Sequence, residues 1–327
     1  MNYAQTSALL TEWKKTDGLA FLNEVSSVPL QQSLRHLQTA FTAFWEKRSR
    51  YPRFKSRKRG KASAEYTRSA FRWRDGRLTL AKTAEPLDIV WSRPLPEGAE
   101  PSTVTVSRDP AGRWHVSILV ETTVTHVAPI DRVVGVDAGI TSLLTLSTGE
   151  KITNPRHERR DRERLARTQR ALARKRKGSA NRARSRLRVA RVHARIADRR
   201  RDLLHKLTTR LVRENQLVVI EDLAVRNMVN RTLARAISDA SWSDLRSMLE
   251  YKCRWYGRDL VVVDRWLPSS KTCSACGRLR DRLPLHVRAW TCECGAGHDR
   301  DVNAAKNILA AGLAVTACGD GVRPTRR

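Results

Sequence analysis

Apolar residues recur at two different spacings in the first third of the chain. Residues 5–46 carry apolar side chains three or four positions apart, which predicts helices. Residues 64–122 instead contain short β-rich runs in which apolar and polar residues alternate, separated by turn signals such as Asp75-Gly76. We expect a helical segment followed by a small antiparallel sheet or barrel.

The pattern of apolar and polar residues changes after residue 132, where short apolar runs predict the strands of a second, mixed α/β region. These runs cover residues 133–137, 142–148, 217–220 and 260–264. A helix is expected near residues 241–258, and another closes the region over residues 301–311. Acidic residues follow or end several of these runs, which makes their ends candidate sites.

A long segment between the second and third of these strands is rich in Ala, Leu, Arg and Lys, all good helix formers. It covers residues 156–214 and is broken at Gly178-Ser179-Ala180-Asn181. We therefore expect an antiparallel helical hairpin with a narrow apolar seam. The seam of its second helix is predicted at Leu187, Ala190, Ala194, Ala197, Leu204, Leu207 and Leu211.

Charge points to a polyanionic partner. The 327 residues include 63 Lys and Arg against 33 Asp and Glu, a formal charge of +30, and nucleic acid is the first candidate for such a chain. No apolar run approaches the length of a membrane span, and the start shows no signal pattern. Six cysteines are too few for a disulfide scaffold of this size.

Half of the charge lies in one place. Residues 156–202 hold 20 basic and 5 acidic residues, and residues 47–61 hold 9 basic and no acidic ones. A solvated charged helix and a disordered basic linker are the simpler alternatives, but the first segment lacks the mixed signs of such a surface. The candidate nucleic-acid contacts are Arg53, Lys55, Arg57, Lys58, Arg167, Arg170, Arg174, Lys175, Arg176, Lys177, Arg184, Arg188 and Arg191.

Three carboxylates suggest phosphodiester chemistry. Asp137 and Glu221 end apolar strands, and Asp301 begins the closing helix. A buried carboxylate is costly unless it is paired or binds metal. Such a trio fits a site in which two divalent ions about 4 Å apart cut nucleic acid, and hard oxygen ligands suit Mg²⁺ or Mn²⁺. A turn or helix cap would explain the same residues.

Other acidic residues compete with the trio. Asp222 follows Glu221 directly, so in a continuing strand it points to the opposite face. Asp264 also ends a strand and could support a ligand. Asp299 lies two residues before Asp301 and faces a different direction on a helix.

Four cysteines form two closely spaced pairs, Cys273 with Cys276 and Cys292 with Cys294, and a glycine follows each pair. This spacing is typical of a tetrahedral zinc ribbon rather than of disulfides. The second pair has one intervening residue instead of two, so its loop must be tighter. If Cys294 does not reach the metal, His298 is the reserve ligand.

These motifs together resemble the TnpB (OrfB-type) family, transposon-encoded RNA-guided nucleases ancestral to type V CRISPR effectors. The resemblance spans nearly the whole chain. The matching segments are GVDAG at 135–139, VIEDLAVRNM at 219–228, SSKTCSACG at 269–277, WTCECGAGHDRDVNAAKNIL at 290–309, VPLQQSLRHLQTAFTAFW at 28–45 and YPRFK at 51–55.

The resemblance implies a mixed α/β fold: an RNase H-like (RuvC) nuclease domain with an inserted basic helical hairpin and a zinc ribbon, preceded by a helical lobe and a small antiparallel β wedge domain. Its Asp-Glu-Asp trio falls on Asp137, Glu221 and Asp301, and its ribbon on the four cysteines. The expected boundaries are 1–60 for the recognition lobe, 61–130 for the wedge, 131–155, 216–268 and 298–313 for the nuclease, 156–215 for the hairpin, 269–297 for the ribbon and 314–327 for a tail.

The function implied is RNA-guided, metal-dependent cleavage of target DNA, with structural Zn²⁺ and catalytic Mg²⁺ or Mn²⁺. The expected partners are a transposon-derived guide RNA and double-stranded DNA, with no membrane and no small-molecule substrate, in a prokaryotic cytoplasm near the nucleoid. Family members usually begin with a basic strand and about 50 further residues, so this chain is expected to lack the first wedge strand. A nucleic-acid-binding regulator without cleavage and a strand-transfer transposase are the alternatives.

Overall fold

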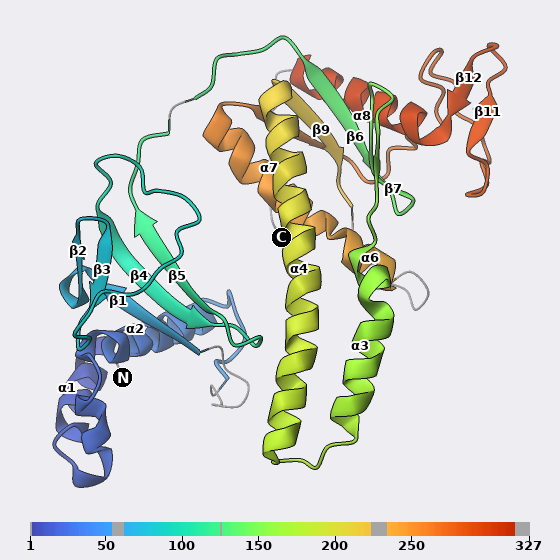
Figure 1. Cartoon of the computed structure of the whole chain (residues 1–327). Coiled ribbons are helices and arrows are strands. Elements are labelled where there is room, and N and C mark those ends of the chain that lie inside the picture. Colours follow the sequence, from blue (N-terminus) through green and yellow to red (C-terminus); the bar gives the residue numbers. More distant parts are fainter. Residues whose placement is uncertain (1, 54–61, 125, 224–233, 318–327) are drawn as a thin grey trace. The chain divides into compact units, whose positions relative to one another are not determined.

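The computed structural model describes residues 2–53, 62–124, 126–223 and 234–317. The chain divides into two compact units, residues 1–123 and 124–327, each of which is described by itself (Figure 1). Among the described helices, none has both the length and the hydropathy to cross a lipid bilayer.

The first unit consists of helices followed by antiparallel strands. Its elements are α1 (Tyr3–Trp13), η1 (Asp17–Asn23), α2 (Ser27–Trp45), β1 (Ala62–Thr67), η2 (Arg68–Ala70), β2 (Phe71–Arg74), β3 (Arg77–Leu80), β4 (Pro101–Arg108) and β5 (Trp114–Val120). The sheet order is β1-β4-β5, and β2 pairs with β3. Asp75 and Gly76 both have positive φ, as a two-residue hairpin of this kind requires, so the predicted turn is present.

The second unit is built on a five-stranded sheet of order β10-β9-β6-β7-β8. Its strands are β6 (Val133–Ala138), β7 (Ser142–Leu146), β8 (Lys151–Thr153), β9 (Leu217–Glu221) and β10 (Asp259–Val263). The neighbours β10, β9 and β6 are parallel, whereas β7 and β8 are antiparallel. The helices and the small ribbon hairpin are α3 (His157–Ala173), α4 (Ala180–Glu214), α6 (Ala234–Ala240), α7 (Trp242–Tyr256), α8 (Arg300–Ala317), β11 (Ala289–Thr291) and β12 (Gly297–Asp299).

Helices cover both faces of this sheet. Val218 and Ile220 of β9 belong to a core shared with α4 and α7. Leu217 and Val219, which point the other way, pack with Ile308 of α8. Because side chains alternate along a strand, the odd-numbered residues of β9 face α8.

Close backbone contact holds α8 against β6. A Cβ atom at Gly135 would lie 2.2 Å from the carbonyl oxygen of Ala305, and one at Gly312 would lie 2.5 Å from the methyl groups of Val219. Only glycine permits these approaches. The two glycines therefore set the height of α8 above the sheet.

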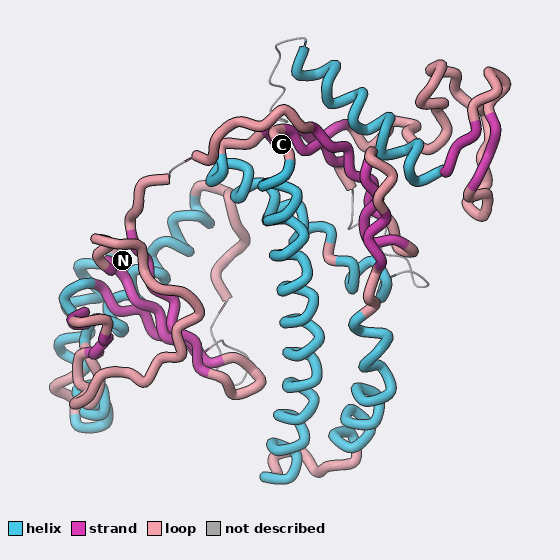
Figure 2. The backbone as a smooth tube through the Cα atoms, turned by 45° about the horizontal axis from the view of Figure 1, so that its top comes forward, coloured by secondary structure: helices cyan, strands magenta, loops and turns pink. Residues whose placement is uncertain are grey.

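The basic segment forms two long helices, α3 and α4, that lie side by side and are joined by a short loop (Figure 2). The predicted seam of α4 is right only in its second half, where Leu204, Leu207 and Leu211 are buried. In the first half the buried apolar residues are Val192 and Ile196, which pack on Leu165. Val192 lies two positions from the predicted Ala190 and Ala194, about 200° around the helix. The predicted alanines are half-buried, so of the two apolar faces the one with branched side chains is the more deeply buried.

Candidate functional site

The ends of β6 and β9 place two of the predicted carboxylates side by side. The strands are parallel, with Val136 opposite Ile220, so Asp137 and Glu221 are the next residues along each strand. Asp137 lies two residues after Gly135, and Glu221 lies two residues after Val219, so each pair shares one face of its strand. The Cβ positions of Gly135 and Val219 face α8. Asp137 and Glu221 therefore point to the α8 side of the sheet.

Asp301 completes the group from the first turn of α8. It lies one turn before Ala305, whose carbonyl oxygen lies over Gly135. The three carboxylates line one cleft of about 440 Å³. The other lining residues are Arg265, Trp266, Leu267, Pro268, Ser269, Ser270, Lys271, Arg300 and Ala304.

The electrostatics of this cleft oppose ionisation. Burial, together with the negative charges of Asp301 and Glu221, raises the pKa of Asp137 to about 7. Burial also raises the pKa of Glu221 to about 7, with a contribution from Asp222. Within the described chain, neither Asp137 nor Glu221 has a side-chain hydrogen bond or ion pair, so both are open to a cationic ligand.

The competing acidic residues are already engaged. Asp222 pairs with Arg246 of α7 at 2.6 Å and with Arg265, on the face opposite to Glu221. Asp299 accepts hydrogen bonds from the amides of Asp301 and Val302 at 3.1 Å each and pairs with Lys151 at 2.7 Å.

Asp264 accepts a hydrogen bond at 2.7 Å from the backbone amide of Trp266, so it holds a turn. Within the trio, Asp301 alone has a charged partner among the described residues. The guanidinium of Arg288 lies 3.2 Å from an Asp301 oxygen. Arg288 was not predicted; it comes from the cysteine-rich segment, and sequence spacing gives no signal for it.

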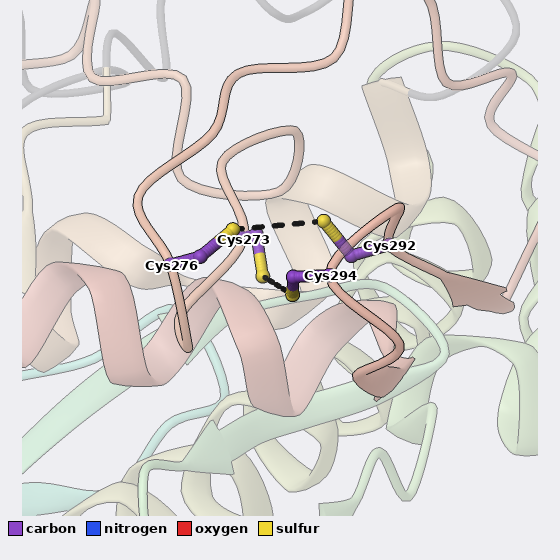
Figure 3. Close-up of side chains that lie close together, drawn as sticks. All are labelled: Cys273, Cys276, Cys292 and Cys294. Atoms are coloured by element: carbon purple, nitrogen blue, oxygen red, sulfur yellow. Dashed lines mark hydrogen bonds between the residues drawn. The ribbon is translucent and has the colours of Figure 1, made fainter.

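The four cysteines converge on one point (Figure 3). Their sulfur atoms all lie within 4.8 Å of one another. Cys273 Sγ lies 3.8 Å from Cys294 Sγ, and Cys276 Sγ lies 3.7 Å from Cys292 Sγ. Thiolates bound at 2.3 Å to a tetrahedral zinc ion would be about 3.8 Å apart, so the donor set fits zinc.

The tight second loop does not keep Cys294 away from the group. Gly295, like Gly277 in the first loop, has a positive φ that turns the chain after the cysteine. Cys294 therefore completes the set of four. The reserve residue His298 instead contacts Cys273 Sγ through Nε2 at 3.0 Å, and none of the five described cysteines is in a disulfide.

Hydrogen bonds fix this ribbon to α8. The side chain of Asn303 is 1% exposed; its amide donates to the carbonyl of Thr272 at 2.7 Å, and its oxygen accepts from the amide of Ser274 at 2.9 Å. Asn307 donates to the carbonyls of Ser269 and Thr272 at 2.7 and 2.6 Å. The ribbon and Asp301 therefore share one rigid support, which the sequence did not reveal.

The basic candidates fall into three groups. Those of the helical hairpin are all exposed, and none forms an ion pair with another described residue: Arg167, Arg170, Arg174, Lys175, Arg176, Lys177, Arg184, Arg188 and Arg191. Arg53 is exposed in the first unit. Lys55, Arg57 and Lys58 lie outside the described residues.

Comparisons with known proteins find relatives along the whole chain. Residues 115–232 match the OrfB family of IS605, described as "Probable transposase", and residues 242–308 match "Cas12f1-like, TNB domain". A Streptomyces pristinaespiralis protein named "Putative RNA-guided DNA endonuclease" is 74% identical over 327 residues, 100% of this chain and 81% of the relative. The similarly named InsQ of Escherichia coli K12 is 35% identical over 353 residues, 99% of this chain and 84% of the relative.

A solved structure shares the fold. The cryo-EM structure of a Cas12f1–sgRNA–target DNA complex superposes with a TM-score of 0.54 at 15% identity, covering 86% of this chain and 71% of that chain. With the two relatives, this confirms the resemblance seen in the motifs. The chain belongs to the TnpB (OrfB-type) family of transposon-encoded proteins.

Proposed function

We propose that this chain is an RNA-guided, divalent-metal-dependent DNA endonuclease encoded by an insertion sequence. Hydrolysis would occur in an RNase H-like (RuvC) domain, at Asp137, Glu221 and Asp301. The observation that carries the proposal is the cleft in which these carboxylates meet with raised pKa values at Asp137 and Glu221. Buried carboxylates that form no ion pair within the protein, such as Asp137 and Glu221, are expected where bound cations balance their negative charge.

The chain's own residues would hold the metal and position the phosphate. The three carboxylates provide hard oxygen ligands of the kind that Mg²⁺ and Mn²⁺ prefer. Bound ions would supply an activated water and a counter-charge for the leaving oxygen. Arg288, beside Asp301, places a guanidinium where an incoming phosphate group would need a positive partner.

The remaining regions would serve binding and support. Zn²⁺ held by Cys273, Cys276, Cys292 and Cys294 would be structural, because all four positions of the tetrahedron are taken by protein. The unpaired basic side chains of the α3–α4 hairpin would contact phosphates of the guide RNA and target DNA. The names of the relatives support these two partners for the chain.

The decisive experiment isolates the protein with its bound RNA, sequences that RNA, and incubates the complex with Mg²⁺ and a matching plasmid. We expect a discrete RNA and cutting that EDTA abolishes. Asp137→Ala should eliminate cutting, whereas Asp244→Asn, at an exposed acidic residue of α7, should retain it. Absence of a discrete RNA, or cutting that survives Asp137→Ala, would overturn the proposal.

A further inference from the structure

An exposed tryptophan lies at the rim of the carboxylate cleft. Trp266 is 84% exposed, yet it lines the same cleft as Asp137, Glu221 and Asp301. Single exposed apolar side chains are common on protein surfaces, so exposure alone does not assign Trp266 a role. Its position does, because the ring lines the cleft and is available to any molecule that enters it to reach the carboxylates.

The loop that carries Trp266 is rigid. The backbone amide of Trp266 donates to Asp264 Oδ1 at 2.7 Å, and that of Leu267 donates to the Asp264 carbonyl at 3.2 Å. The preceding Arg265 pairs with Asp222. The following Leu267 packs into the core between β9, β10 and α8. The backbone that carries the ring is thus held in place by these contacts.

The charges around the ring favour nucleic acid. Lys271 and Arg300 line the same cleft and donate only to neutral groups, the carbonyls of Asp281 and Pro284 and the hydroxyl of Ser270. Neither forms an ion pair with another described residue, although Arg300 is buried and its charge also acts on Asp137. Half-exposed Lys271 is therefore the charge open to a phosphate. An aromatic ring beside such a charge is the usual arrangement for stacking a base while its phosphate is held.

We infer that Trp266 stacks on an unpaired base of the DNA strand that lies in the cleft and so positions that strand for cutting. The inference rests on the proposed function, because it takes the occupant of the cleft to be DNA. A paired base in a duplex has both faces covered by its neighbours, so only an unpaired base can offer a face to the ring. Trp266 would then favour single-stranded over double-stranded substrate next to the carboxylates.

The test needs neither cutting nor a guide. The full chain carrying Asp137→Ala is mixed with fluorescein-labelled oligothymidine at high salt, where phosphate contacts contribute least, and affinity is read from anisotropy. We expect Trp266→Ala to weaken binding about tenfold and Trp266→Tyr to retain most of it. The slope of log Kd against log salt should not change, because stacking releases no counterions. Trp255→Ala, at a half-exposed tryptophan of α7 outside the cleft, should leave binding unchanged.

Photo-crosslinking locates the contact directly and does not depend on any tryptophan variant folding. Oligothymidine with a single iododeoxyuridine should crosslink to the tryptic peptide of residues 266–271. A crosslink found only elsewhere, or an unchanged affinity of Trp266→Ala, would overturn the inference. If the complex cuts DNA while Trp266→Ala binds normally, the inference fails alone. If Trp266 crosslinks but no guided cutting occurs, the proposed function fails instead.

Discussion

Two clusters of metal-type ligands flank the first turn of α8, and they are organised in opposite ways. The four cysteine sulfurs lie within 4.8 Å of one another, the one group in the described chain that converges so closely. The three carboxylates line a cleft without such convergence, and the pKa values of Asp137 and Glu221 are raised. The four sulfur atoms of the ribbon are thus arranged around one point, whereas the carboxylates of the cleft stay apart and repel one another when ionised.

The difference follows from what supports each cluster. The ribbon has a small core of its own, formed by Cys273, Leu283, Trp290 and Cys292, which is too little apolar surface to stabilise a fold without a metal or a crosslink. The carboxylates stand on a five-stranded sheet covered on both faces. The ribbon should therefore depend on its metal, and the cleft should keep its fold without one.

Removing a ribbon ligand is the strongest test of this contrast. Cys276→Ser should eliminate one equivalent of zinc and cost at least about 4 kcal/mol of local stability, because metal binding and ribbon folding are one process. Metal analysis and hydrogen exchange over residues 289–299 measure this. Cys253→Ala, at a buried cysteine of α7, is the matched control and should keep the zinc. Unchanged exchange protection in Cys276→Ser would show that the ribbon folds without metal.

The next test acts on the sheet side of α8. Gly135→Ala should destabilise the second unit by about 3 kcal/mol, since the new Cβ would collide with the backbone of Ala305. Chemical denaturation gives the free energy, and DNA cutting should fall because Asp301 moves with the helix. Gly297→Ala, where an added Cβ meets nothing within 4 Å, is the control. Equal stability of the two variants would mean that α8 does not need this close approach.

The sequence predicts the strands that carry the carboxylates better than it predicts the side chains that surround them. Strand ends at Asp137 and Glu221 follow from apolar runs that stop at an acidic residue, and strand alternation places Asp222 on the other face, where Arg246 lies. Such periodicities are local. Arg288 reaches Asp301, and Trp266 reaches the cleft, only through tertiary folding, so no spacing in the sequence indicates them.

The same limit explains the error in α4. Two apolar stripes run along its first half, and the sequence does not say which one α3 will cover. In the structure, Leu165 of α3 packs on Val192 and Ile196. These two side chains bury more apolar surface than alanine does.

A smaller effect is expected where the two clusters are joined. Asn303→Ala should cost about 2 kcal/mol, because the backbone groups of Thr272 and Ser274 lose a buried partner. It should also weaken Mg²⁺ binding, which isothermal calorimetry measures, since the ribbon no longer fixes α8 and Arg288. Lys306→Ala, on the exposed side of the same helix, should change neither quantity. Normal Mg²⁺ affinity in Asn303→Ala would mean that the ribbon supports the cleft in some other way.

The smallest effect concerns the carboxylates' own charge. Because the pKa values of Asp137 and Glu221 are about 7 in the folded chain, against ordinary values near 4, the folded state retains protons that the unfolded state has lost. Stability without metal should therefore fall as pH rises from about 4 to about 7. Asp137→Asn removes the most strongly perturbed of these charges, so near pH 8 in EDTA it should be about 1 kcal/mol more stable than the parent chain.

Urea unfolding of both proteins at about pH 5 and about pH 8 measures this. The two should differ little at the lower pH, where Asp137 is largely protonated, and diverge at the higher one. Saturating Mg²⁺ at about pH 8 should reverse the order, because only the parent chain gains stability by binding the ion. Asp244→Asn should follow the parent chain throughout. An Asp137→Asn variant less stable than its parent in EDTA at about pH 8 would show that the carboxylate is already satisfied by the protein, and that the cleft resembles the ribbon after all.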